Sequence, residues 1–118
     1  HGAGTTARFN QVKRVAADTE NGDFIVVDGL NYRIRRLPMD GTTASYDVLG
    51  DGTNAYLEGT GTGAQLAEPI AVAVRTGAGG DIIWSDIGTS NNRVRRATAA
   101  GVTSLLVGSG VAGWADGT

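Results

Sequence analysis

The chain has 118 residues, of which 41% are hydrophobic and 19% are charged, which excludes a disordered or fibrous chain and favours one globular domain. The formal net charge of −2 argues against a generic nucleic-acid-binding protein, which usually has a basic surface. Cysteine is absent, so disulfides, thiolate metal sites and cysteine nucleophiles are excluded. No apolar run approaches the roughly 20 residues of a membrane-spanning helix.

The sequence repeats itself once. Asp28 recurs as Asp86, a spacing of 86 − 28 = 58 residues, and the whole segment 22–36 recurs as 80–96. Glycine is abundant, with 19 residues against 2 prolines, and it gathers between short apolar runs. This pattern is typical of turns between many short strands. Self-similarity at such a period indicates a repeat architecture.

The two repeats span residues 1–60 and 61–118, and each is predicted to form four short strands. The predicted strands are 12–17, 23–28, 32–37 and 43–49 in the first repeat and 70–75, 81–86, 92–98 and 102–107 in the second. Asn-Gly and Asp-Gly pairs in the links favour tight turns. No segment has a sustained helical period, so we predict an all-β fold of two four-stranded antiparallel sheets.

The third strand of each repeat alternates between apolar and basic residues. This alternation predicts that Ile34 and Val94 point inward. The arginines predicted to point outward are Arg33, Arg35, Arg93 and Arg95.

The segments VAADTENGDFIVVDGLNYRIRRL and PIAVAV…GGDIIWSD…NNRVRR resemble the NHL repeat of β-propeller proteins. The connecting segment VLGDGTNAYLEGTGTGAQLAEP is similar to the longer linker between blades of that family. The resemblance implies that each repeat is a four-stranded β-propeller blade. It assigns structural roles to Asp28, Asn31, Arg33, Asp86, Asn91 and Arg93.

In a propeller blade, the first strand lies near the crowded central axis. The apolar first strand of each repeat is therefore expected to be buried on both faces, as the run IAVAV over residues 70–74 illustrates. Three features depart from the family pattern. Gln11-Val12-Lys13 stands where the family usually has a Pro-Gly-like entry. Arg75 stands where the first repeat has Asp18, and His1-Gly2 stands where an acidic residue followed by glycine is expected.

A propeller closes with about 4 to 8 blades, and a single repeat unit cannot bury its apolar faces alone. Two blades alone therefore make an incomplete propeller. The sequence starts and ends at equivalent positions of the repeat. The chain is therefore expected to be part of a longer polypeptide or to form a homo-oligomer. A head-to-tail contact of this kind gives a ring if it closes and a filament if it does not.

The arginine clusters 33–36 and 93–96 allow two interpretations. They could form a basic strip that binds RNA, as some NHL proteins do, or another anionic partner. In the structural interpretation, Arg33 and Arg93 pair with Asp28 and Asp86 inside each blade, and the other arginines are solvated. The structural interpretation is favoured, so nucleic acid is not expected as a partner.

Catalytic, metal and cofactor sites are not predicted. The only histidine is His1, so the chain lacks a set of histidine ligands. The EF-hand spacing is also missing, so the pairs Asp40-Gly41 and Asp51-Gly52 are interpreted as turns, and calcium binding is the less favoured interpretation. The glycine-rich segment 59–66 lacks the lysine and helix of a phosphate loop and is assigned to the connector.

The two tryptophans fall in different settings. Trp84 lies in a predicted strand and is expected in the core between the blades. Trp114 matches Tyr56 of the connector; the pair could lock the connector to the next blade, which we favour, or stack on carbohydrate. The candidate partner-contact residues are Arg36, Tyr56, Arg96 and Trp114.

These features predict a non-catalytic structural or interaction module that presents loops to a protein or glycan. The alternatives are a fragment of a lyase-like propeller enzyme whose catalytic residues lie outside this chain, and RNA binding through the arginines. An extracellular or cell-surface location is expected from a Gly/Thr-rich composition with Lys13 as the only lysine and no initiator methionine.

Overall fold

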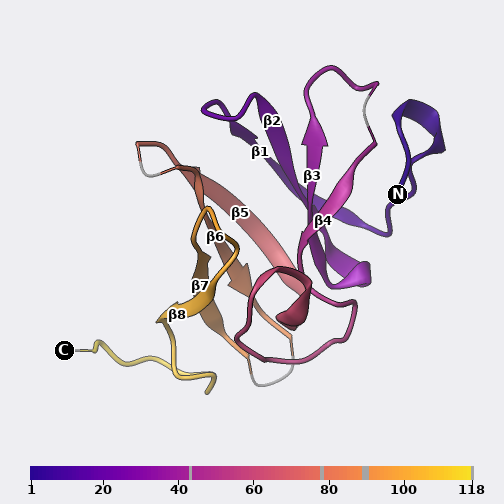
Figure 1. Cartoon of the computed structure of the whole chain (residues 1–118). Helices are drawn as coiled ribbons and strands as arrows, with labels where there is room; N and C mark the ends of the chain where they lie inside the picture. Colours follow the sequence, from indigo (N-terminus) through magenta and orange to yellow (C-terminus); the bar gives the residue numbers. More distant parts are fainter. Residues whose placement is uncertain (43, 78, 89–90, 118) are drawn as a thin grey trace.

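The computed structural model describes residues 1–42, 44–77, 79–88 and 91–117. They form two four-stranded antiparallel sheets with the strand orders β1-β2-β3-β4 and β5-β6-β7-β8 (Figure 1). The N-terminal sheet consists of β1 (Val12–Asp18), β2 (Asp23–Asp28), β3 (Arg33–Pro38) and β4 (Tyr46–Leu49). The C-terminal sheet consists of β5 (Pro69–Arg75), β6 (Asp81–Asp86), β7 (Arg93–Ala97) and β8 (Thr103–Val107). Single 3-10 turns lie at Gly4–Thr6 (η1), Gly29–Asn31 (η2) and Gly61–Gly63 (η3).

The predicted strands agree with the observed ones to within one residue at every end except the start of β4. Tyr32 and Asn92 fall outside β3 and β7 because their φ angles of 51° and 28° are left-handed and break the extended backbone. The strand predicted from residue 43 begins only at Tyr46, after Ser45 forms an isolated bridge with Gly2. Thr43 itself lies outside the described residues.

The two sheets pack against each other through β5, which contacts both β1 and β2 (Figure 1). The core between them contains Ile25, Ile34 and Leu49 from the N-terminal sheet. The C-terminal sheet contributes Ile82, Trp84 and Ala97, and Leu66 of the connector joins the same cluster. The expectation that Trp84 lies in the core between the two repeats is therefore confirmed.

The packing joins opposite faces of the two repeats. Side chains alternate along a strand, so Ile25 and Ile82, which meet in the core, belong to different faces of their sheets. The repeat equivalent of Ile25 is Ile83, which points to the other side of the C-terminal sheet. We call the side of the N-terminal sheet that carries Ile25 and Ile34 the stacked face. Its equivalent in the C-terminal sheet, which carries Ile83 and Val94, is the open face.

The expectation that the first strand of each repeat is buried on both faces is wrong for this structure. Val12 and Val15 of β1 are 48% and 50% exposed, and Ala73 of β5 is also exposed. The physical reason is that, among the described residues, β1 and β5 pack mainly within their own sheets and across the one interface between the sheets. The apolar sequence of these strands therefore exceeds what this two-sheet unit can bury.

We predict that Trp84→Ala destabilises the fold by about 3–5 kcal/mol, because it removes a large buried side chain and leaves a cavity between the sheets. Urea unfolding followed by circular dichroism measures the loss. The control Met39→Ala, at an exposed position in the link between β3 and β4, should cost less than about 0.5 kcal/mol. Equal losses for the two variants would contradict the assigned core.

Candidate functional site

A buried arginine fastens the connector between the repeats to the C-terminal sheet. Arg95 is fully buried, and its Nη1 donates to Oδ2 of Asp86 at 2.8 Å and to the carbonyl oxygen of Gln65 at 2.7 Å. Its Nη2 donates to the carbonyl oxygen of Leu57 at 2.8 Å and to Oε2 of Glu58 at 3.0 Å. One guanidinium therefore ties three points of the connector to a carboxylate of β6.

The N-terminal sheet contains the equivalent site around Arg35. Nη1 of Arg35 donates to Oδ2 of Asp28 at 3.2 Å and to the carbonyl oxygen of Arg8 at 2.6 Å. Nη2 donates to Oγ of Ser45 at 2.7 Å and lies 3.4 Å from Nδ1 of His1. His1 thus occupies the place that Glu58 has beside Arg95, as the repeat phase of the two residues indicates.

This geometry corrects the predicted ion pairs of the residues to which the NHL resemblance assigns structural roles. Asp28 and Asp86 form their ion pairs with Arg35 and Arg95, not with Arg33 and Arg93 as the structural interpretation assumed. The prediction that Arg35 and Arg95 point outward into solvent is also wrong. Arg33 and Arg35 share one face of β3, so the alternation alone could not choose between them; the carbonyl acceptors from distant segments decide it.

The other residues to which the resemblance assigns structural roles form hydrogen bonds and ion pairs next to these two arginines. Nη2 of Arg33 donates to the carbonyl oxygen of Asp51 at 2.7 Å, and its Nε lies 3.0 Å from Oδ2 of Asp47. Asn31 donates to Oδ2 of Asp28 at 2.9 Å. In the C-terminal sheet, Arg93 donates to Oδ1 of the buried Asn91 at 2.7 Å.

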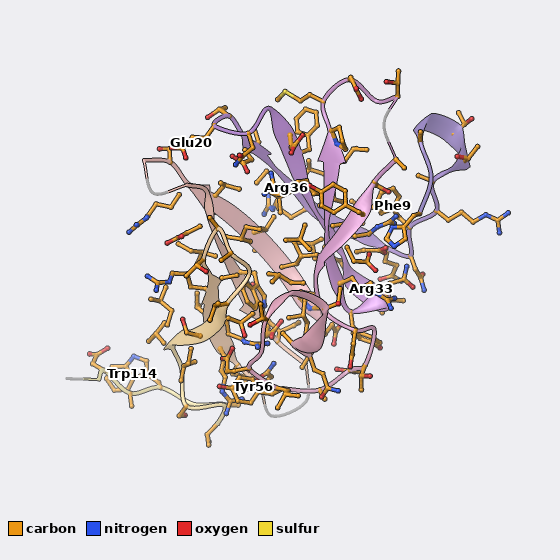
Figure 2. The ribbon with its side chains drawn as sticks, in the orientation of Figure 1. Phe9, Glu20, Arg33, Arg36, Tyr56 and Trp114 are labelled. Carbon is orange, nitrogen blue, oxygen red and sulfur yellow. The ribbon has the colours of Figure 1, made fainter. Side chains whose placement is uncertain are left out.

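Two of the four candidate partner-contact residues take part in internal contacts. The side chain of Arg36 is 14% exposed and its Nη1 contacts Asp18 at 2.7 Å and Asp23 at 3.0 Å, on the stacked face (Figure 2). The guanidinium groups of Arg93 and Arg95 lie 4.1 and 4.9 Å from the ring centre of Tyr56, a cation–π arrangement. Tyr56 therefore holds the connector on the sheet.

The other two candidates lie at the surface. The side chain of Arg96 is 38% exposed on the open face, with Nη1 at 3.9 Å from Oδ2 of Asp81. The ring of Trp114 is 90% exposed in a C-terminal tail that leads away from both sheets (Figure 2). With Arg35 and Arg95 buried and Arg36 turned between the sheets, the arginine clusters do not form the continuous basic strips that the RNA interpretation needs.

A polar cavity of about 220 Å³ lies beside Arg35 on the outer side of the N-terminal sheet. It is lined by His1, Arg8, Asp28, Asn31, Arg33, Arg35 and Asp47. Sequence reasoning missed this cavity because its lining comes from three separate segments. The sequence signal for this cavity was Arg35, the second arginine of the run RIRR, because a buried arginine needs hydrogen-bond acceptors around it.

A shallow apolar groove of about 210 Å³ lies on and beside the open face. Its lining residues are Ala71, Val72, Ala73, Ile83, Trp84, Ser85 and Val94. Among the described residues, no group of three or more histidine and acidic side chains is placed to hold a metal ion. The described helical turns are all too short to cross a membrane.

The aspartates considered as calcium ligands form turns instead. Oδ1 of Asp51 accepts from the backbone N–H of Thr53 at 2.7 Å, and Oδ1 of Asp40 accepts from that of Thr42 at 2.9 Å. Gly52 and Gly41 follow with φ angles of +95° and +66°, which glycine tolerates best. Both Asp-Gly pairs therefore have the turn role that the sequence predicted.

Burial and ion pairing act in opposite directions on the acidic groups. Burial alone would raise the pKa of Asp18, but hydrogen bonds from Asn21 and Arg36 outweigh it and hold that pKa below its usual value. The pKa of Glu58 is lowered in the same way, because contacts with Arg95 and Thr103 outweigh burial. Burial raises the pKa of Asp86, and Arg95 opposes that rise.

No protein-family model and no curated protein matches the chain. Solved structures do match. An auxiliary nutrient binding protein from Bacteroides ovatus ATCC 8483 is 20% identical with a TM-score of 0.70, covering 84% of this chain and 26% of that one. An auxiliary nutrient binding protein from Bacteroides thetaiotaomicron VPI-5482 is 19% identical with a TM-score of 0.66, covering 80% of this chain and 25% of that one. The chain thus spans about a quarter of their length, and the likeness shows the fold alone.

We predict that Arg95→Leu destabilises the fold by about 3–5 kcal/mol, because Asp86 is left buried without its counter-charge. The double variant Arg95→Leu/Asp86→Leu should recover part of that loss, since no unpaired charge remains. Urea unfolding measures both. Arg75→Ala, at a side chain that is 56% exposed, is the control and should change stability little.

We also predict an acid-sensitive contribution from Asp18. A carboxyl whose folded-state pKa is lowered stabilises the fold above its unfolded-state pKa, and that stabilisation is lost as the pH falls through the folded-state pKa. The free energy of unfolding should therefore decrease below about pH 4. Asp18→Asn should flatten this decrease in urea titrations at several pH values. An unchanged pH profile in that variant would speak against the Asp18–Arg36 contact.

Proposed function

We propose that the chain is a non-catalytic structural and interaction module whose two sheets are β-propeller blades of the NHL kind. The blades stack head to tail on further blades, in a ring or filament, and present their connector loops to a protein or glycan partner. The observation that carries the proposal is that one face of the repeat is covered in the N-terminal sheet and uncovered in the C-terminal sheet.

Equivalent residues on the stacked and open faces differ systematically in exposure. Leu49 is fully buried beneath the connector, whereas its equivalent Val107 is 62% exposed. Ile34 is fully buried, whereas its equivalent Val94 lines the apolar groove. Likewise, Ile25 is fully buried, whereas its equivalent Ile83 lines the apolar groove. The open face thus has the apolar character of a covered face without a cover in this unit, which supports stacking by a further blade.

The similar solved structures support a binding role in general terms. Both are described as nutrient binding proteins, and their chains are about four times as long as the matched segment. An extracellular or cell-surface location is part of the proposal and rests on the Gly/Thr-rich, Lys-poor composition.

The proposal predicts self-association of the chain. In sedimentation velocity, the particle mass should rise with concentration above that of one 12.1 kDa chain. Ile83→Glu places an unpaired charge on the open face and should shift the protein to the monomer, since burying that charge is costly. Met39→Glu, in the exposed link between β3 and β4, is the matched control. A folded monomer at every concentration would overturn the proposal.

A further inference from the structure

The C-terminal tail repeats the first half of the connector. Tail residues Gly108, Gly110, Trp114 and Asp116 are the repeat equivalents of Gly50, Gly52, Tyr56 and Glu58. The two segments also start in the same way. Arg33 donates to the carbonyl oxygen of Asp51 at 2.7 Å, and Arg93 donates to the carbonyl oxygen of Ser109 at 3.1 Å. Beyond that anchor, the connector folds onto a sheet, whereas the tail leads into solvent (Figure 2).

In the connector, the residues that correspond to Trp114 and Asp116 contact the arginines of the next sheet. Tyr56 lies over Arg93 and Arg95, and Glu58 pairs with Arg95. Trp114 has the stronger cation–π acceptor ring of the two aromatics, and it is 90% exposed. The tail therefore carries the same kinds of aromatic and acidic side chains as the connector, with Trp114 exposed.

The matching arginine site is at the other end of the molecule. Arg33 and Arg35 are the equivalents of Arg93 and Arg95. Phe9 already lies over Arg35, with its ring centre 4.2 Å from the guanidinium group. Over Arg33, the part of the chain that the structure describes places no such ring. The polar cavity of about 220 Å³ opens beside both arginines. Its lining includes three arginines and two aspartates, so a carboxylate complements its charge.

His1 holds the position of Glu58 only loosely. Its side chain is 52% exposed, and its ring nitrogens lie 3.4 Å from Arg35 and 3.4 Å from Asp47. A carboxylate at this position would form a shorter, charge-assisted hydrogen bond with the guanidinium group and would therefore displace the loosely held ring.

We propose that the tail of one copy binds the arginine site of a second copy. Trp114 stacks on Arg33 as Tyr56 stacks on Arg93, and Asp116 displaces His1 from Arg35. This inference rests on the proposed head-to-tail stacking, and it identifies the polar contact that fixes which end of one copy meets which end of the next.

A peptide of residues 108–117 tests the contact directly. Added to the full chain at a concentration where the chain is monomeric, it should cause saturable NMR shifts at the side-chain N–H groups of Arg33 and Arg35. The Trp114→Ala peptide should lose most of this binding, whereas the Val111→Ala peptide should keep it. No saturable shift at Arg33 would overturn the proposed contact.

Variants of the full chain test the contact in the assembly. Trp114→Ala should weaken self-association by about two- to thirty-fold, the range of one cation–π contact. His1→Glu places a carboxylate of the same chain beside Arg35 and should also weaken it, whereas His1→Ala should not. If the chain assembles and Trp114→Ala has no effect, the tail contact is wrong and stacking stands. If the chain stays monomeric at every concentration, stacking and the tail contact between copies both fail, whether or not the peptide binds.

Discussion

The structure depends on one buried arginine in each sheet. Arg35 and Arg95 each neutralise an aspartate at the end of a central strand and satisfy carbonyl groups of a segment that has no regular structure of its own. A buried guanidinium without acceptors would be costly, and so would the aspartate without the guanidinium. The irregular segment and the sheet therefore hold each other in place.

This arrangement explains how a glycine-rich chain of this size keeps long connectors in fixed positions. The connector contributes few apolar groups besides Leu66 to the core, and its order comes from polar contacts with Arg95 and from Tyr56. The two repeats use the same scheme with different partners. His1 stands where Glu58 stands, and Arg75 stands where Asp18 stands, so the equivalent surfaces differ in charge.

The sequence predicted the strands well because their signals are local. Alternation, turn glycines and the internal repeat place all eight strands and assign Trp84 to the core. The arginine sites were predicted less well, because Arg33 and Arg35 point to the same side and both lie near Asp28. The choice between them depends on carbonyl oxygens from residues far away in the chain, such as Arg8 and Gln65, which no local pattern reveals. The burial of β1 was overestimated for a related reason, since exposure depends on how many sheets are stacked.

Because opposite faces of the two repeats meet in the core, both sheets face the same way, and any larger assembly built from this contact has a direction. A stack built from this contact has one end that always exposes the open face of β5–β8 and another that always exposes the outer side of β1–β4. Growth at one end then differs chemically from growth at the other. A single unit with an altered open face would join the stack through its N-terminal sheet and stop further addition, as capping repeats do at the ends of solenoid proteins.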